Sequence, residues 1–167
     1  MRGAEYWVRI LGLAKHPEGG YFSETYRSAE TVAAGHLPAR FGGDRCFSTA
    51  IYYLLAGDDF SSLHRIASDE TWHFYRGSPL AIHCLGADTG YRKIILGDDP
   101  GRGQSLQATV PAGAWFGAEV NDKNSFSLVG CTVAPGFDFA DFEEGKSDEL
   151  SLMFPEHAGL IRRLTRK

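Results

Sequence analysis

The sequence contains few cysteines, and their spacing excludes two classes of small protein. There are three, Cys46, Cys84 and Cys131, and no two of them form a Cys-x-x-Cys pair. An odd number of widely spaced thiols fits neither a disulfide framework nor a zinc knuckle. We therefore expect free thiols and a reducing, cytoplasmic location.

Positive charge and long apolar runs are also scarce. The formal net charge is −4 at pH 7, which gives phosphate backbones no long-range attraction. The one basic cluster suits the end of a solvated helix and consists of Arg162, Arg163, Arg166 and Lys167. No apolar run approaches the ~20 residues that a membrane-spanning helix needs, and the first residues lack the apolar core of a signal peptide. We therefore predict that neither nucleic acid nor a membrane is a partner.

Aromatic residues, in contrast, are abundant, with eleven Phe, seven Tyr and three Trp. Flat rings pack well on a pleated, half-buried surface and so favour β-structure. From Phe47 onward, short strand-like runs alternate with turn residues. The predicted strands cover 47–55, 60–66, 71–77, 79–85, 91–96, 107–111, 115–120, 126–133 and 137–143. Eight or nine short strands at this spacing predict an all-β sandwich or barrel.

The two ends of the chain are predicted to be helical. Apolar residues at helical spacing predict an amphipathic helix over residues 4–14, with its apolar side at Trp7, Ile10, Leu11 and Ala14. Pro155 suits the first turn of a C-terminal helix, whose buried stripe would be Leu160, Ile161 and Leu164.

Two further segments complete the predicted organisation. Residues 21–27, YFSETYR, follow the glycine pair Gly19-Gly20 and are predicted as a strand. Residues 29–46 show no periodicity and are predicted as a long loop, of the kind that often forms a lid or a binding loop. We find no internal repeat or linker, so residues 1–167 are predicted to form a single domain.

The most informative stretch is residues 64–77, HRIASDETWHFYRG. Glu70 follows His64 by six residues, and Gly77 follows Glu70 by seven. If Glu70 opens a strand, period-two alternation places Trp72 and Phe74 on its face. An imidazole and a carboxylate then lie at neighbouring strand ends above aromatic walls.

The same alternation decides which residues lie on the other face of this strand, and a turn further along the chain marks the start of a second strand. Thr71, His73 and Tyr75 point away from Glu70. Downstream, the turn VPAG leads into a strand that begins with Trp115 and Phe116.

These residues resemble two motifs of the cupin superfamily. The first motif of its metal-binding members has His, any residue, His, three or four residues, Glu, six residues and Gly; the matching positions here hold His64, Ile66, Glu70 and Gly77. VPAGAWF resembles the second motif, with Pro111 and Gly113 in place. The runs HPEGGYFSETYRS, DETWHFYRG and APGFDFADFE are similar to an uncharacterised cupin subfamily related to the dTDP-dehydrorhamnose epimerases.

The resemblance extends over about residues 5–165. It implies a double-stranded β-helix, the cupin jelly-roll barrel, with a short helix at each end and a small-molecule pocket inside. It also implies that Glu18, Tyr21 and Glu24, in the HPEGGYFSETYRS run, contribute to the mouth of that pocket.

Two departures from the cupin motifs bear on metal binding. Ile66 stands where the second His of the first motif is expected, and Phe116 where the His three residues after Gly113 is expected. Only His64 and Glu70 remain of the four usual ligands, whereas a stable divalent site normally takes at least three protein ligands. The prediction is no cofactor, with a weakly held divalent metal at His64 and Glu70 as the alternative.

His64 and Glu70 are predicted as the functional pair, catalytic if the protein is an enzyme. A carboxylate inside an aromatic-lined barrel is costly unless it is paired or used. The predicted ligand-binding residues are Trp72, Phe74, Phe116, Tyr53, Glu24 and Tyr21. Trp72, Phe74 and Phe116 suit a plain core position equally well, as does Trp115, and a histidine on a strand can be purely structural.

Three functions stay open at this point, because one barrel can host all of them. The first is binding, without catalysis, of a carbohydrate-like or nucleotide-sugar-like molecule. The second is a metal-independent sugar epimerase or isomerase, in which His64 removes a proton next to a carbonyl, Glu70 orients it or acts as the acid, and Tyr53 or Tyr75 returns a proton. The third is an oxygenase or isomerase with a weakly held metal.

We also predict a homodimer. His73 and Tyr75, together with Tyr53, would make an outward strand face bulkier than a solvated surface requires. Exposed aromatic patches of this sort usually mark an interface.

Overall fold

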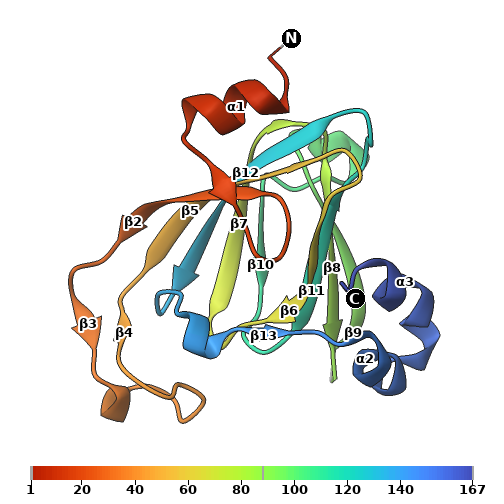
Figure 1. The fold of residues 1–167 in the computed structure, drawn as a ribbon. Helices are drawn as coiled ribbons and strands as arrows, with labels where there is room; N and C mark the ends of the chain where they lie inside the picture. Colours follow the sequence, from red (N-terminus) through yellow and green to blue (C-terminus); the bar gives the residue numbers. More distant parts are fainter. Residues whose placement is uncertain (1, 88, 167) are drawn as a thin grey trace.

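The computed structural model describes residues 2–87 and 89–166 and consists mainly of two antiparallel sheets that face each other (Figure 1). The strands of the first sheet, in spatial order, are β1 (Ala14–Lys15), β2 (Tyr21–Arg27), β5 (Thr49–Ala56), β12 (Phe126–Ala134), β7 (Asp69–Gly77) and β10 (Gln107–Val110). Those of the second are β13 (Glu143–Glu144), β6 (Phe60–Arg65), β11 (Trp115–Val120), β8 (Leu80–Gly86) and β9 (Gly90–Leu96). The predicted all-β jelly-roll barrel is confirmed.

The alternation predicted for β7 decides which side chains enter the barrel. Glu70, Trp72 and Phe74 are buried, whereas Tyr75 is half exposed on the outer face. Tyr53 on β5 points inward and is only 3% exposed. Tyr53 therefore cannot belong to the outward face on which the homodimer prediction was based. The homodimer stays a prediction, with His73 and Tyr75 as the remaining residues of the expected interface.

The main core fills the space between the sheets, and its members alternate along the strands with outward-facing residues. It includes Tyr53, Leu55, Trp72, Phe74, Leu80, Ile82, Phe116, Val129 and Val133. Burying such side chains contributes about 1.5–3 kcal/mol each, so this cluster holds the two sheets at the spacing that leaves room for a cavity.

The N-terminal helix is shorter than predicted. α1 covers Ala4–Ile10, and Ile10 is 59% exposed rather than buried. The predicted continuation to residue 14 is wrong because Ala14 and Lys15 pair with the edge of β2. An open strand edge offers unpaired N–H and C=O groups to any extended segment beside it.

The C-terminal region contains one helix that was predicted and one that was not. α2 (Ser147–Met153) was not anticipated, whereas the predicted C-terminal helix is divided into η4 (Pro155–His157) and α3 (Ala158–Arg163). Ile161 and Leu164 are buried as predicted, against Leu63 and Trp115 of the second sheet. Among residues 2–87 and 89–166, no helix is long and apolar enough to cross a membrane.

Two segments, residues 29–46 and 137–143, differ from their predicted structures. The predicted loop at 29–46 contains the paired strands β3 (Thr31–Val32) and β4 (Arg45–Cys46), with η1 (Ala34–His36) between them. The predicted strand at 137–143 is instead η3 (Phe139–Asp141) followed by β13. Its first turn forms because the Asp138 carboxylate accepts the Ala140 N–H at 2.8 Å, a local bond that competes with extension. A further short turn, η2 (Pro100–Arg102), connects β9 and β10.

A buried ion pair joins these two segments. Arg45 Nε donates to Asp141 Oδ2 at 2.6 Å, and both side chains are 5% exposed. We expect Asp141→Asn to lower the free energy of unfolding by about 2–4 kcal/mol, because it leaves a buried guanidinium without its counter-charge. Urea unfolding would measure the loss.

The control for this substitution is Glu143→Gln, at a half-exposed pair with Arg65. An exposed pair contributes about 1 kcal/mol or less. Equal losses in the two variants would contradict a structural role for the Arg45–Asp141 pair.

Candidate functional site

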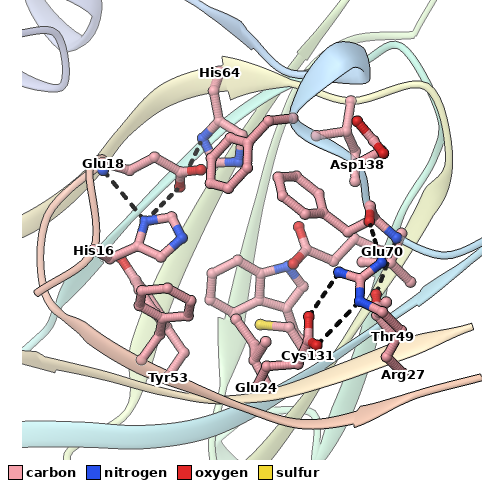
Figure 2. A pocket seen from close by; sticks show the side chains of 17 residues that line it. His16, Glu18, Glu24, Arg27, Thr49, Tyr53, His64, Glu70, Cys131 and Asp138 are labelled. Atoms are coloured by element: carbon pink, nitrogen blue, oxygen red, sulfur yellow. Dashed lines mark hydrogen bonds and ion pairs between the residues drawn. The ribbon is translucent and has the colours of Figure 1, made fainter. Parts of the chain in front are cut away.

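A cavity of about 300 Å³ lies between the two sheets, inside the barrel (Figure 2). Its apolar wall is formed by Phe22, Ile51, Tyr53, Ile66, Trp72, Val133, Phe137 and Phe139. Its polar lining consists of His16, Glu18, Glu24, Arg27, Thr49, His64, Glu70, Cys131 and Asp138. An apolar cavity with a few convergent polar groups is typical of small-molecule sites.

The turn at residues 16–20, HPEGG, carries Glu18 into this cavity. Gly19 and Gly20 have φ values of +114° and +72°, which residues with a Cβ rarely adopt. A Cβ at Gly19 would also collide with the Phe60 carbonyl oxygen and the Arg166 guanidinium. The Asp59 carboxylate completes the turn by accepting the Gly20 N–H at 2.8 Å.

Glu18 is fixed at both its backbone and its side chain. Its carbonyl oxygen accepts hydrogen bonds from Ser62 N at 3.0 Å and from Arg166 Nη2 at 3.0 Å. The Ser61 hydroxyl donates to its carboxylate at 3.1 Å. Arg166 was expected at a solvated helix end and instead holds the turn, whereas Lys167 of the same basic cluster lies outside the described residues.

The His64 side chain lies beside Glu18, on β6. Its Nδ1 is 2.7 Å from the Ser62 carbonyl oxygen and 3.3 Å from Glu18 Oε2. A carbonyl oxygen only accepts, so Nδ1 carries the proton and Nε2 is the acceptor of the neutral ring. Burial lowers the pKa of His64, which keeps the imidazole neutral at pH 7.

His16 is the second imidazole of the cavity, across from His64 in Figure 2. Its Nδ1 accepts the Glu18 N–H at 3.2 Å, and its ring packs edge-on against Phe22 and Tyr53. Burial lowers its pKa to about 4, with repulsion from a charged His64 as the second cause. Both imidazoles are therefore neutral near pH 7.

The two buried carboxyls hold their protons unusually tightly. Burial raises the pKa of Glu18 to about 8, against the opposing effect of the Ser61 hydrogen bond. Burial also raises the pKa of Glu70 to about 7, while attraction to His64 lowers it. Neutral imidazoles beside protonated carboxyls give this cavity both proton acceptors and proton donors near neutral pH.

The arrangement differs from the predicted pair in one respect. The charge of Glu70 raises the pKa of His64 against the larger effect of burial. Within residues 2–87 and 89–166, however, the carboxylate within ion-pair distance of His64 is that of Glu18. The charge of Glu18 adds to burial in raising the pKa of Glu70, and His64 has in Glu18 a carboxyl neighbour that its own motif does not contain.

These pKa shifts predict how stability depends on pH. For Glu18 and Glu70 the folded pKa lies above the unfolded value of 4.5, so their ionisation destabilises the fold as pH rises from 4.5 to about 8. For His16 the folded pKa of about 4 lies below 6.5, so stability is lost as pH falls from 6.5 to about 4. The two effects oppose each other between pH 4.5 and 6.5.

Above pH 6.5 only the carboxyl effect remains, so we expect the melting temperature to fall between pH 6.5 and about 8. Glu18→Gln has no proton to lose and should flatten that decline. Thermal melts of both proteins over this range provide the measurement. A wild-type melting temperature that is constant or rises with pH would contradict the raised carboxyl pKa values.

Five of the eight predicted site residues line the cavity: His64, Glu70, Trp72, Tyr53 and Glu24. Three do not. Phe74 and Phe116 belong to the core, although the Phe116 ring is 4.1 Å from that of His64. Tyr21 packs outside the barrel, where its ring lies under the Lys15 ammonium at 4.0 Å.

The two tyrosines considered as proton donors are not free to act in that way. The Tyr53 hydroxyl donates to the Gly19 carbonyl oxygen at 2.8 Å and supports the HPEGG turn. Tyr75 is on the outer face of β7, with its ring 6.0 Å from that of Tyr52. The proton donors closest to His64 are therefore carboxyl groups.

Sequence reasoning missed several lining residues, and Arg27 shows why. A β-bulge between Glu24 and Tyr26 shifts the register of β2 against β5. Simple alternation would place Tyr26 on the Glu24 face, but the bulge places Arg27 there and leaves Tyr26 54% exposed. Glu18, expected at the mouth, is instead 7% exposed. The other polar lining residues not anticipated are His16, Thr49, Cys131 and Asp138.

The residues at the metal positions of the cupin motif do not fit a metal. The Ile66 side chain lines the cavity, and Phe116 contributes an aromatic ring to the His64 environment. Among residues 2–87 and 89–166, no three His, Cys, Asp or Glu side chains are grouped as ligands for one ion.

Comparisons with known proteins agree with this architecture. Residues 5–144 match the family described as Cupin superfamily (DUF985). The uncharacterized protein YML079W of Saccharomyces cerevisiae is 32% identical over 158 residues, which cover 87% of this chain and 78% of the yeast protein. A hypothetical protein from Leishmania major is 38% identical with a TM-score of 0.89, covering 99% of this chain and 100% of that one.

More distant structures share the fold alone. Oxalate decarboxylase from Bacillus subtilis superposes with a TM-score of 0.54 at 12% identity, covering 92% of this chain and 37% of that one.

Protein SO0799 from Shewanella oneidensis is much more similar, with a TM-score of 0.87 at 35% identity over 99% of both chains. By its family match and by relatives above 30% identity along most of its length, the chain belongs to the DUF985 family of the cupin superfamily.

Proposed function

We propose that the barrel binds a small carbohydrate-like molecule in the cavity, with His64 and Glu70 orienting it. The observation that carries this proposal is the cavity itself, whose apolar and aromatic wall surrounds convergent imidazole and carboxyl groups. Its volume of about 300 Å³ is at the small end of ligand pockets. This favours a ligand of about monosaccharide size.

One wall residue offers a ligand a donor that the protein leaves unused. The Trp72 side chain lines the cavity and is 2% exposed, yet its indole N–H has no hydrogen-bond partner in the described structure. A buried donor without a partner costs about 1–3 kcal/mol. The N–H itself is covered, so a ligand oxygen accepts this bond only when the ring or its neighbours shift to open it to the cavity, and the bond then recovers that cost.

The binding proposal can be tested by filling the cavity. Val133 and Thr132 are neighbours on β12, but only Val133 lines the cavity, while Thr132 faces outward and pairs with His73. We expect Val133→Phe to abolish binding of a sugar found by calorimetric screening, because the ring occupies its space. Thr132→Phe adds the same bulk outside and should leave the affinity within about threefold of wild type. Equal affinities in the two variants would contradict the cavity as the binding site.

A second candidate function is proton transfer, as in a metal-independent epimerase or isomerase. It is favoured by the unprotonated Nε2 of neutral His64 beside carboxyls with raised pKa values. In this reaction His64 Nε2 takes a proton from a carbon next to a carbonyl, and the C–H electron pair moves to form an enolate. Glu70 then returns a proton to the other face of that carbon. Transfer of the proton from the His64 imidazolium to the Glu70 carboxylate restores the starting state.

Deuterium from solvent separates binding from this reaction. A bound sugar with an exchangeable C–H next to a carbonyl should gain one deuterium per turnover in D₂O, detected by mass spectrometry. His64→Asn should stop that incorporation because it removes the base, and Glu70→Gln should stop inversion at the carbon because it removes the acid on the other face. Binding without any incorporation would support the non-catalytic function and remove the epimerase candidate.

A further inference from the structure

The charge of the cavity lining restricts which ligand it accepts, and Arg27 is the residue that decides it. Among the described lining residues, Arg27 is the one arginine or lysine. Its guanidinium is turned toward Glu24, where Nε donates to Oε1 at 3.0 Å and Nη2 to Oε2 at 2.7 Å (Figure 2). This is the two-pronged geometry with which arginine would otherwise bind a phosphate.

The remaining guanidinium nitrogen of Arg27 is also occupied. Nη1 donates to the Phe137 carbonyl oxygen at 3.1 Å and lies 3.6 Å from Cys46 Sγ. Every nitrogen of this cation therefore has a protein partner, and its charge is balanced by Glu24. The two side chains are 45% and 41% exposed, so the pair lies where the cavity meets solvent. An incoming phosphate would have to displace a carboxylate from the guanidinium.

The rest of the lining gives an anion no positive charge to bind. Besides Glu24, the cavity is lined by Asp138, Glu18 and Glu70, and the raised pKa values of Glu18 and Glu70 leave them partly protonated near pH 7. Its two imidazoles have lowered pKa values and are neutral near pH 7, so they supply no compensating charge. An anion placed here would be desolvated beside acidic groups, which is unfavourable.

The groups left available suit neutral oxygens and hydroxyls. The Trp72 indole N–H is an unpartnered donor, and His64 Nε2 is an acceptor. Glu18 and Glu70, with pKa values of about 8 and about 7, can donate when protonated and accept when ionised. Aromatic walls at Phe22 and Phe137 offer flat apolar surfaces.

We infer that the cavity selects uncharged, hydroxyl-rich ligands of about monosaccharide size and excludes phosphorylated and nucleotide-linked sugars. This inference rests on the proposed binding function and narrows its ligand class. It assigns to the Glu24–Arg27 pair the role of a specificity determinant that occupies a potential phosphate site.

The test uses inorganic phosphate as the probe, titrated calorimetrically at constant ionic strength. We expect no binding to the wild-type cavity and binding at least about tenfold tighter to Glu24→Gln, because that variant frees the Arg27 fork. The double variant Glu24→Gln, Arg27→Gln should lose the gain. Glu149→Gln is the matched control, since Glu149 of α2 pairs at the same i, i+3 spacing with Lys146, the residue before that helix, outside the barrel.

A second arm compares an uncharged monosaccharide with its phosphate ester on the wild-type protein. Tighter binding of the parent sugar supports the inference. Equal or tighter binding of the phosphate ester, or a Glu24→Gln variant with no phosphate gain, overturns it. A different result would contradict the proposed function itself. It fails if no sugar, charged or uncharged, binds to the protein, or if Val133→Phe leaves the binding unchanged.

Discussion

Replacing His64 with asparagine is expected to weaken ligand binding, or turnover if the site is catalytic, by at least about 100-fold. Asparagine retains an N–H that can donate to the Ser62 carbonyl, but it lacks the Nε2 acceptor of the imidazole. The fold should change little, because His64 is neutral and the variant leaves no charge unpaired. Calorimetric titration with the sugar, beside a urea unfolding curve, measures both effects.

Glu70→Gln should have a similar effect on function, because it keeps the shape of the side chain and removes its titration. A purely structural role for these two residues makes the opposite prediction. In that case either substitution lowers the free energy of unfolding by about 1–3 kcal/mol, the cost of leaving a buried hydrogen-bonding group without its partner. A large loss of stability with unchanged ligand affinity would contradict the functional assignment.

Replacing Gly19 with alanine is expected to give the largest loss of stability, about 3 kcal/mol or more. The backbone at Gly19 has a φ of +114°, and an added Cβ meets the Phe60 backbone and the Arg166 side chain. Relief of that collision requires the HPEGG turn to move away from β6. Since the same turn carries Glu18, a variant that folds should also bind ligand less tightly.

The control for Gly19→Ala is Gly35→Ala, in η1. Gly35 has ordinary φ and an added Cβ there has nothing within 4 Å. Its stability should stay within about 1 kcal/mol of wild type. Chemical denaturation of the two variants provides the comparison, and a loss at Gly19 no larger than at Gly35 would show that the turn tolerates a side chain.

The parts of the fold that depend on local pattern were predictable. Alternation on β7 correctly separated Glu70 and Trp72 from Tyr75, and the breaker residues correctly marked most strand ends. The His64 and Glu70 motif pointed to the interior of the barrel, where the structure has its cavity. Each of these predictions needs only the neighbours of a residue in the chain.

The parts that were missed depend on contacts between distant segments or on irregular geometry. Arg166 holds Glu18 across 148 residues, and Arg45 pairs with Asp141 across 96. Neither partner can be recognised from its own sequence environment. The bulge in β2 places Arg27 in the cavity against the alternation rule, and no residue type in YFSETYR signals it.

The central claim is that a small, uncharged molecule binds beside Trp72 inside the barrel, and indole signals in a ¹H–¹⁵N spectrum test it most directly. The chain has three Trp, at positions 7, 72 and 115. All three indole N–H groups are buried without a partner in the described structure, but only Trp72 lines the cavity. On titration with a sugar that binds, we expect the Trp72 signal to shift and those of Trp7 and Trp115 to stay, with no shift in His64→Asn. A saturating ligand that leaves Trp72 unchanged, or that moves Trp7 or Trp115 instead, would contradict the account.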